Sequence, residues 1–167
     1  MTPYGGDIED VERAIAQRLR SAAFRDVLAA VDAGKGDGTT TPGPVSVFEG
    51  EKVVQRGEGY PVAHVIGIRT AYASDPNIDK ERAHQVQVEF TQTGEDETAI
   101  KRHLQRLVRA TVEFFWPAGT PGITLEELRT TPVIVRDEEY SALGLTDEHP
   151  PFIKAASLQL LVTTFAL

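Results

Sequence analysis

The sequence predicts an α+β protein: a mainly antiparallel, twisted sheet with two main helices packed on one side. In one stretch, His84, Val86, Val88 and Phe90 alternate with polar residues, which is the period of a strand with one buried face. Further on, apolar residues recur at steps of three and four, as on one face of a helix; they are Ile100, Leu104, Leu107, Val108, Thr111 and Phe115. The predicted order of elements is helix, strands, hairpin, helix, strands.

Length and composition set the broad class. The chain has 167 residues, which favours a single domain spanning 1–167 with a sizeable core. A formal charge of −8 argues against a protein whose main task is to wrap nucleic acid. The absence of cysteine excludes disulfides, thiolate zinc sites and cysteine nucleophiles. No stretch has the roughly 18 apolar residues of a membrane span, and no signal pattern opens the chain, so we expect a cytosolic product without membrane contact.

The first part of the chain predicts a helix followed by a loop. Asp7 suits the N-cap, and an apolar stripe then continues to Val31, which predicts one long helix. Residues 32–44 (DAGKGDGTTTPGP) contain four glycines and two prolines, which predicts a flexible connector. The GKGDGTT within it lacks the spacing of a phosphate-binding loop.

The middle of the chain predicts strands. Residues 45–56 resemble two short extended pieces around Glu49 and Gly50, which favours a hairpin. The run after Pro61 (VAHVIGIRTAYAS) predicts a central strand whose first half is covered on both faces. Residues 74–82 (SDPNIDKER) then form a second flexible loop, the tip of a long antiparallel hairpin.

The last part predicts a helix, a turn and two strands. Three carboxylates at 95–97 favour a helix start there, and PAGTPG at 117–122 ends the helix. Thr124 and Glu127 have the spacing of a capping box, so we expect a helical turn over 124–129. We further expect a short strand at 131–136, a helical turn around 140–143, and a final strand from Ile153 to Phe165 inside the sheet.

The search for catalytic chemistry gives little. His64 and His84 lie on the two strands of the predicted hairpin and can meet on one face, but Glu89, the nearest third ligand, points to the other face. His103 and His149 lack the companions of an HExxH motif, and the serines lack a GxSxG context. No sequence feature places two carboxylates in an apolar pocket. We therefore expect no enzyme, no catalytic residue, no cofactor and no metal.

One charged feature stands out. The second main helix carries basic residues predicted to lie opposite its apolar stripe: Lys101, Arg102, Arg106 and Arg109. These residues form either a solvated face or a surface that meets carboxylates of a neighbouring subunit or DNA phosphates. The acidic stretch after residue 136 is a natural complement, beginning with Asp137, Glu138 and Glu139. Contacts of this kind would join copies of the chain into a ring through a heterologous interface.

Four passages carry a resemblance to a known family: DIEDVERAIAQRLRSA, YPVAHVIGIRTAYAS, AHQVQVEFTQTGEDETAIKRHLQRLVRATVEFF and AASLQLLVTTFAL. In pattern and order, they resemble the tail terminator, or tail completion, proteins of long, non-contractile-tailed bacteriophages. The resemblance implies a small α+β subunit of a hexameric ring with no catalytic residues. Such a ring sits at the head-proximal end of the virion tail, stops polymerisation of the tail tube protein, and presents a surface to the head–tail connector protein. DNA would pass through it without sequence-specific binding.

Two alternatives remain open from the sequence. One is another head–tail connector or neck protein, because such proteins often share related folds. The other belongs to a different class, a small-ligand-binding or hydrolase domain of α+β type. The loops at 32–44 and 74–82 suit contacts with the tail tube or the connector.

Overall fold

The computed structural model describes residues 6–50, 59–72, 81–140 and 151–165. These residues form three α-helices, α1 (Ile8–Leu19), α2 (Ala22–Lys35) and α3 (Glu97–Phe115), and a short 3₁₀ turn, η1 (Glu126–Leu128). The five strands are β1 (Ser46–Glu49), β2 (Val62–Tyr72), β3 (Glu81–Gly94), β4 (Ile134–Tyr140) and β5 (Phe152–Phe165). The α+β class predicted from the sequence is confirmed.

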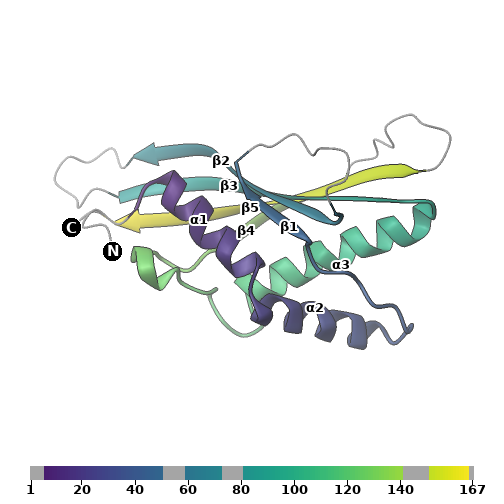
Figure 1. Cartoon of the computed structure of the whole chain (residues 1–167). Helices are drawn as coiled ribbons and strands as arrows, with labels where there is room; N and C mark the ends of the chain where they lie inside the picture. The colour runs from purple at the N-terminus through teal and green to yellow at the C-terminus, as the bar shows by residue number, and fades with distance from the viewer. Residues whose placement is uncertain (1–5, 51–58, 73–80, 141–150, 166–167) are drawn as a thin grey trace.

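The strands form one sheet in the order β1-β2-β3-β5-β4. The pairing of β1 with β2 is parallel, and the other three pairings are antiparallel. The helices lie together beneath one face of this sheet (Figure 1). The two longest strands, β3 and β5, pair along their whole length, from Glu81 opposite Phe165 to Gly94 opposite Phe152. Helix α3 packs against these two strands, α1 packs mainly against β2, and α2 packs mainly against α3.

The core lies between the sheet and the helices. The alternation predicted for β3 is confirmed, because His84, Val86, Val88 and Phe90 are all buried. The predicted stripe of α3 is also buried, and Asp96 caps the helix by accepting a hydrogen bond from the N–H of Ala99. In β5, one buried face consists of Ala156, Leu158, Leu160 and Val162, as expected. The burial of apolar side chains between the sheet and the helices is the main stabilising contribution to the fold.

The prediction of one long first helix is wrong. The helix breaks between α1 and α2 at Arg20 and Ser21, where Ser21 becomes a new N-cap and accepts a hydrogen bond from the N–H of Phe24. A serine hydroxyl satisfies the free N–H groups of a helix start, so it favours a boundary that apolar spacing alone does not show. The second helix then extends to Lys35 and ends at Gly36, whose φ of 63° is the left-handed conformation that glycine adopts readily.

Several strand boundaries also differ from the predictions. β1 pairs in parallel with β2, and the second half of the hairpin predicted at 45–56 falls outside the described residues. The strand expected at 131–136 instead runs from Ile134 to Tyr140, so Tyr140 belongs to a strand and not to a helical turn. The flexible loop predicted at 74–82 is wrong for its last two residues, because Glu81 and Arg82 begin β3. Residues 74–80 of that loop and 141–143 of the predicted turn are outside the described part of the chain.

The expected turn at 124–129 is present as η1, but without its capping box. Glu127 reaches away from the turn and accepts two hydrogen bonds, at 2.6 and 2.9 Å, from the guanidinium of Arg18 on α1. The N–H of Leu125 bonds instead to the hydroxyl of Thr130. The predicted capping box is absent because Glu127 forms a long-range ion pair with Arg18 instead.

Candidate functional site

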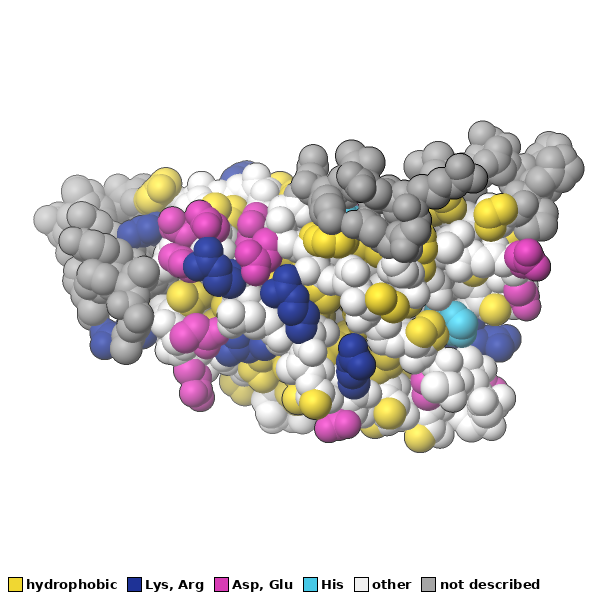
Figure 2. Space-filling model, in the orientation of Figure 1, with side chains coloured by type: hydrophobic (Ala, Val, Ile, Leu, Met, Phe, Trp, Pro, Cys, Tyr) yellow, Lys and Arg dark blue, Asp and Glu magenta, His cyan; other side chains and the backbone are white. Residues whose placement is uncertain are grey.

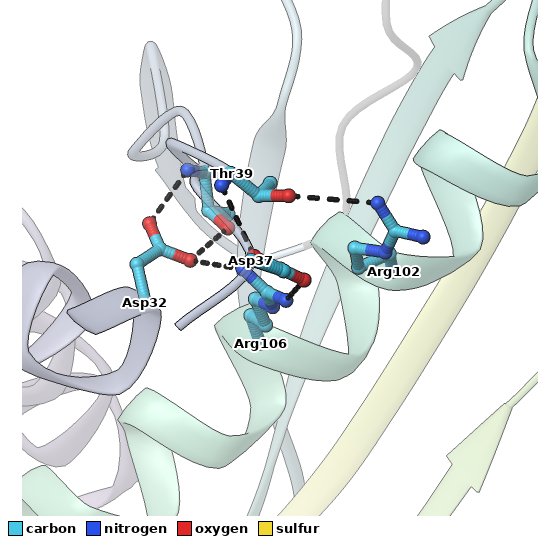
Figure 3. A network of polar contacts seen from close by, with 6 residues as sticks. Asp32, Asp37, Thr39, Arg102 and Arg106 are labelled. Atoms are coloured by element: carbon cyan, nitrogen blue, oxygen red, sulfur yellow. Dashed lines mark hydrogen bonds and ion pairs between the residues drawn. The ribbon is translucent and has the colours of Figure 1, made fainter. Parts of the chain in front are cut away.

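The basic residues of α3 do not form a single exposed stripe. Arg106 faces α2 and is only 5% exposed. Its Nη1 donates a hydrogen bond to Oδ1 of Asp32 at 2.9 Å, and its Nη2 bonds to Oδ2 of Asp37 (Figure 3). Arg106 therefore bridges α3, α2 and the segment that follows α2. The prediction that Arg106 lies opposite the apolar stripe, available to a neighbour, is wrong.

The same two aspartates hold the segment after α2. Asp32 accepts hydrogen bonds from the N–H and the hydroxyl of Thr41, at 2.6 and 2.7 Å, and Asp37 accepts one from the N–H of Thr39 at 3.0 Å. Residues 37–41 are thus tied to the two helices by side-chain contacts (Figure 3). The expectation of a freely flexible connector over 32–44 needs correction, because 32–35 are helical and the next residues are anchored.

Both aspartates have pKa values below their ordinary value. Burial alone raises the pKa of Asp32, but its hydrogen bonds from Thr41 and Arg106 outweigh this and lower it. The hydrogen bond from Arg106 is the main cause that lowers the pKa of Asp37, and the pKa of Arg106 is raised in turn. All three groups are therefore charged at neutral pH, as the two ion pairs of Arg106 require.

Arg102 and Arg109 of α3 border a hollow, which we call the cationic pocket. It has a volume of about 350 Å³ and is lined by Lys35, Arg102, Gln105, Arg106, Arg109, Glu138 and Tyr140. Arg109 donates a 2.7 Å hydrogen bond from Nε to Glu113, and Arg102 lies 3.5 Å from the hydroxyl of Thr39. Lys101 is exposed on the same helix but does not line the pocket.

The acidic residues of β4 divide between the two faces of the sheet. Glu138 is opposite Leu158, on the helix side, whereas Glu139 is opposite Ser157, on the other side. Asp137 lies at the register shift between Arg136 and Glu138 and has a positive φ of 36°. Cross-strand partners share a face, so only Glu138 reaches the cationic pocket. The hydroxyl of Tyr140 bonds to Glu138 at 3.1 Å, and burial together with this carboxylate raises the pKa of Tyr140 to about 12.

A second hollow borders the C-terminal half of α3. It has a volume of about 650 Å³, and its apolar wall comes from both α2 and α3, with Val27, Ala30, Val112 and Trp116. Trp116 is 52% exposed, and its indole N–H donates to the carbonyl of Thr120 at 3.0 Å. Arg109 borders both hollows. The outer surface of α3 is thus cationic in its first half and apolar near its end.

On the side shown in Figure 2, charges of both signs are mixed. Acidic and basic side chains lie next to one another over α1, where Arg13 contacts Glu9 at 2.9 Å and Asp10 at 3.6 Å (Figure 2). Exposed pairs of this kind contribute little to stability and leave no field of one sign. Among the described residues over α1, this face therefore has no region of one charge sign.

The histidines do not meet. His84 is on the helix side of the sheet, and its ring nitrogens lie 2.9 Å from the hydroxyls of Thr70 and Thr164. His64 is opposite Glu89 on the other side, and its ring centroid is 5.7 Å from that of Phe48. The predicted meeting of His64 and His84 on one face is therefore wrong. Among the described residues, no group of three potential ligands is close enough to hold a metal ion.

No protein-family model matches the chain, and a search of curated proteins returns no significant match. In the part of the chain that the structure describes, no helix is long and apolar enough to cross a membrane.

Sequence reasoning missed several residues of this region, namely Asp32, Lys35, Asp37, Thr41, Trp116 and Tyr140. One signal was present: two aspartates and several threonines in a glycine-rich segment suit side-chain bonds to the backbone. No sequence signal pointed from that segment to Arg106, which lies 74 residues after Asp32.

Proposed function

We propose that this protein is the tail terminator subunit of a long, non-contractile-tailed bacteriophage. The observation that carries the proposal is where the resembling passages lie. They fall on α1, β2, β3 with α3, and β5. Strands β2, β3 and β5 are neighbours in the sheet, and α1 and α3 contact them on one side (Figure 1). The resemblance therefore follows one contiguous structural core.

A closed ring requires two different surfaces on each subunit, because each copy contacts its two neighbours through different patches. The first proposed surface is the exposed part of α3, with Lys101, Arg102 and Arg109. The second is Asp137 and Glu139 on the edge strand β4, since Glu139 points away from the helices. Glu138 belongs to the cationic pocket of its own subunit, and Arg106 is buried, so neither contributes.

The edge strand also favours side-chain contacts over strand addition. Edge strand β4 carries Arg136, Asp137, Glu138 and Glu139 in succession and has a register shift. Charges and bulges at a sheet edge discourage another strand from pairing there. We therefore propose that copies join through opposite charges rather than through one continuous sheet. The negative total charge suits a conduit whose wall does not retain DNA.

Native mass measurement of charge variants tests this proposal. We expect the unmodified chain to form hexamers, alone or on tube ends, and Glu139→Arg to weaken them. Combining Glu139→Arg with Arg109→Glu should restore part of the association, because the opposite charges are exchanged. Arg13→Glu, on the mixed-charge surface of α1, serves as the control and should leave association unchanged. A chain that stays monomeric, both free and with tubes, contradicts the proposal.

A further inference from the structure

Two of the basic groups that line the cationic pocket lack an acidic partner among the described residues. Within the described residues, neither Lys35 nor Arg102 has a carboxylate oxygen within 4.0 Å, and Arg109 engages Glu113 only through Nε. Some other cations of the fold have close acidic partners: Arg18 with Glu127, and Lys154 with Glu97, both at 2.6 Å.

Converging like charges make this pocket attractive to anions. Cations on the walls of a hollow repel one another, and the low-dielectric walls concentrate their field. The charge of Arg106 is balanced by its ion pairs with Asp32 and Asp37. Lys35 and Arg102 are therefore the main uncompensated charges of the pocket. An anion that enters would relieve their repulsion and would gain charge-assisted hydrogen bonds.

The donors define the chemical class. N–H groups come from the ammonium of Lys35, the guanidinium groups of Arg102 and Arg109, and the amide of Gln105. They come from α2 and α3 and line a hollow of about 350 Å³, which has room for an anion with more oxygens than a carboxylate. A phosphate offers more oxygens in a tetrahedral arrangement. Glu138 also lines the pocket, and its negative charge disfavours longer polyanions.

We propose that this pocket binds inorganic phosphate or a small phosphate monoester. This site shares Arg102 and Arg109 with the α3 surface proposed for ring contacts, but phosphate binding to the single subunit does not depend on ring formation. Its residues come from both main layers of the fold, because Lys35 ends α2, Arg102 and Arg109 belong to α3, and Tyr140 belongs to β4. A bound phosphate would therefore link the helices to the edge of the sheet.

Titration with inorganic phosphate at constant ionic strength tests the site, with backbone amide chemical shifts as the readout. We expect saturable shifts at residues around Lys35 and Arg102. Lys35→Gln and Arg102→Gln should each weaken binding by about tenfold, the typical effect of losing one charge-assisted hydrogen bond. Lys101→Gln is the matched control, an exposed cation on the same helix outside the pocket, and should change affinity by less than about twofold. Melting curves should show that all three variants remain folded.

Acetate and a short DNA duplex are the competing probes. Weaker binding of acetate than of phosphate supports the proposal, and equal binding overturns the phosphate assignment. Binding of the duplex without saturable binding of phosphate would indicate a DNA surface instead and would also overturn it. The proposal fails as well if phosphate shifts do not saturate, or if Lys101→Gln weakens binding as much as Arg102→Gln.

Discussion

Arg106 on α3 donates a 2.9 Å hydrogen bond to Asp32 on α2, and this buried pair joins the two helices. The same guanidinium binds Asp37, so the segment after α2 depends on it too. Removing one partner from a buried ion pair leaves an uncompensated charge, which is more costly than never having had the pair. Arg106 therefore stabilises the subunit itself. A charge reversal at this position would disturb the fold, so it would not test an interface alone.

Asp32→Ala should destabilise the subunit. The variant leaves Arg106 with Asp37 alone and frees the N–H and hydroxyl of Thr41, so we expect a loss of about 3 kcal/mol in the free energy of unfolding. Urea denaturation measures this loss. Asp26→Ala, at an exposed position of the same helix, is the control and should change stability by less than about 0.5 kcal/mol. Equal effects of the two variants would contradict the role given to the ion network.

Stability should fall in acid in two stages. His84 has a lowered pKa, because of its burial first and then its proximity to Arg82, so its contribution declines as the pH drops below about 6.5, the unfolded value. Asp32 and Asp37 have lowered pKa values as well. Their contribution is complete above the unfolded value of about 3.9 and is lost as the pH falls through the lower folded values.

Denaturation curves between pH 7 and pH 2 measure this dependence. A variant with Asp32→Asn and Asp37→Asn should lose stability less steeply below about pH 4, because it no longer carries the two carboxylates that must be protonated. Asp26→Asn should retain the steep slope. If the double variant follows the unmodified protein below pH 4, the network does not govern the acid limb.

Gly67→Ala should be destabilising, because the glycine lies where α1 approaches β2. A Cβ at this position would come within 2.6 Å of Oε1 of Glu12 and 2.7 Å of Cδ1 of Ile8. We expect a loss of about 1–3 kcal/mol, the usual cost of crowding a packed site. Gly34→Ala is the matched control, because a Cβ on this helical glycine meets no atom within 4 Å. The control should gain up to about 1 kcal/mol, and thermal melts of the two variants should shift in opposite directions.

Val88→Asp should unfold the protein. Val88 is 0% exposed in the centre of the sheet, opposite Val65 on β2 and Leu158 on β5. An unpaired carboxylate there costs an amount comparable to the whole stability of a domain. Gln87→Asp places the same group on the other face of β3, where the side chain is half-buried, and should stay folded. A soluble, folded Val88→Asp protein by circular dichroism would contradict the observed register.

Periodic patterns of apolar residues in the sequence predicted most elements of the fold. The alternation in β3 and β5 and the stripe of α3 were predictable because each face of these elements meets one environment along its whole length. The break at Ser21 was not, because a side-chain cap ended α1 while the apolar spacing continued into α2. The strand at 134–140 was also misplaced, because its exposed, charged sequence is set by its position at the sheet edge.

The candidate site was less predictable than the fold. Placing four basic residues on α3 was correct, but helical spacing alone did not separate the exposed Lys101, Arg102 and Arg109 from the buried Arg106. Which of these residues is buried depends on where α2 packs against α3, and hence on the helix break at Ser21. Likewise, Glu138 and Glu139 are adjacent in sequence but lie on opposite faces of the sheet, which follows from the register with β5.

Electron microscopy of the purified protein mixed with tail tubes tests the central claim most directly. The tail terminator proposal predicts a ring of protein on one end of each tube and no further growth when tube protein is added. The variant with Arg109→Glu and Glu139→Arg should cap tubes better than Glu139→Arg alone. Tubes that remain bare at both ends and continue to elongate in the presence of folded protein would contradict the proposal.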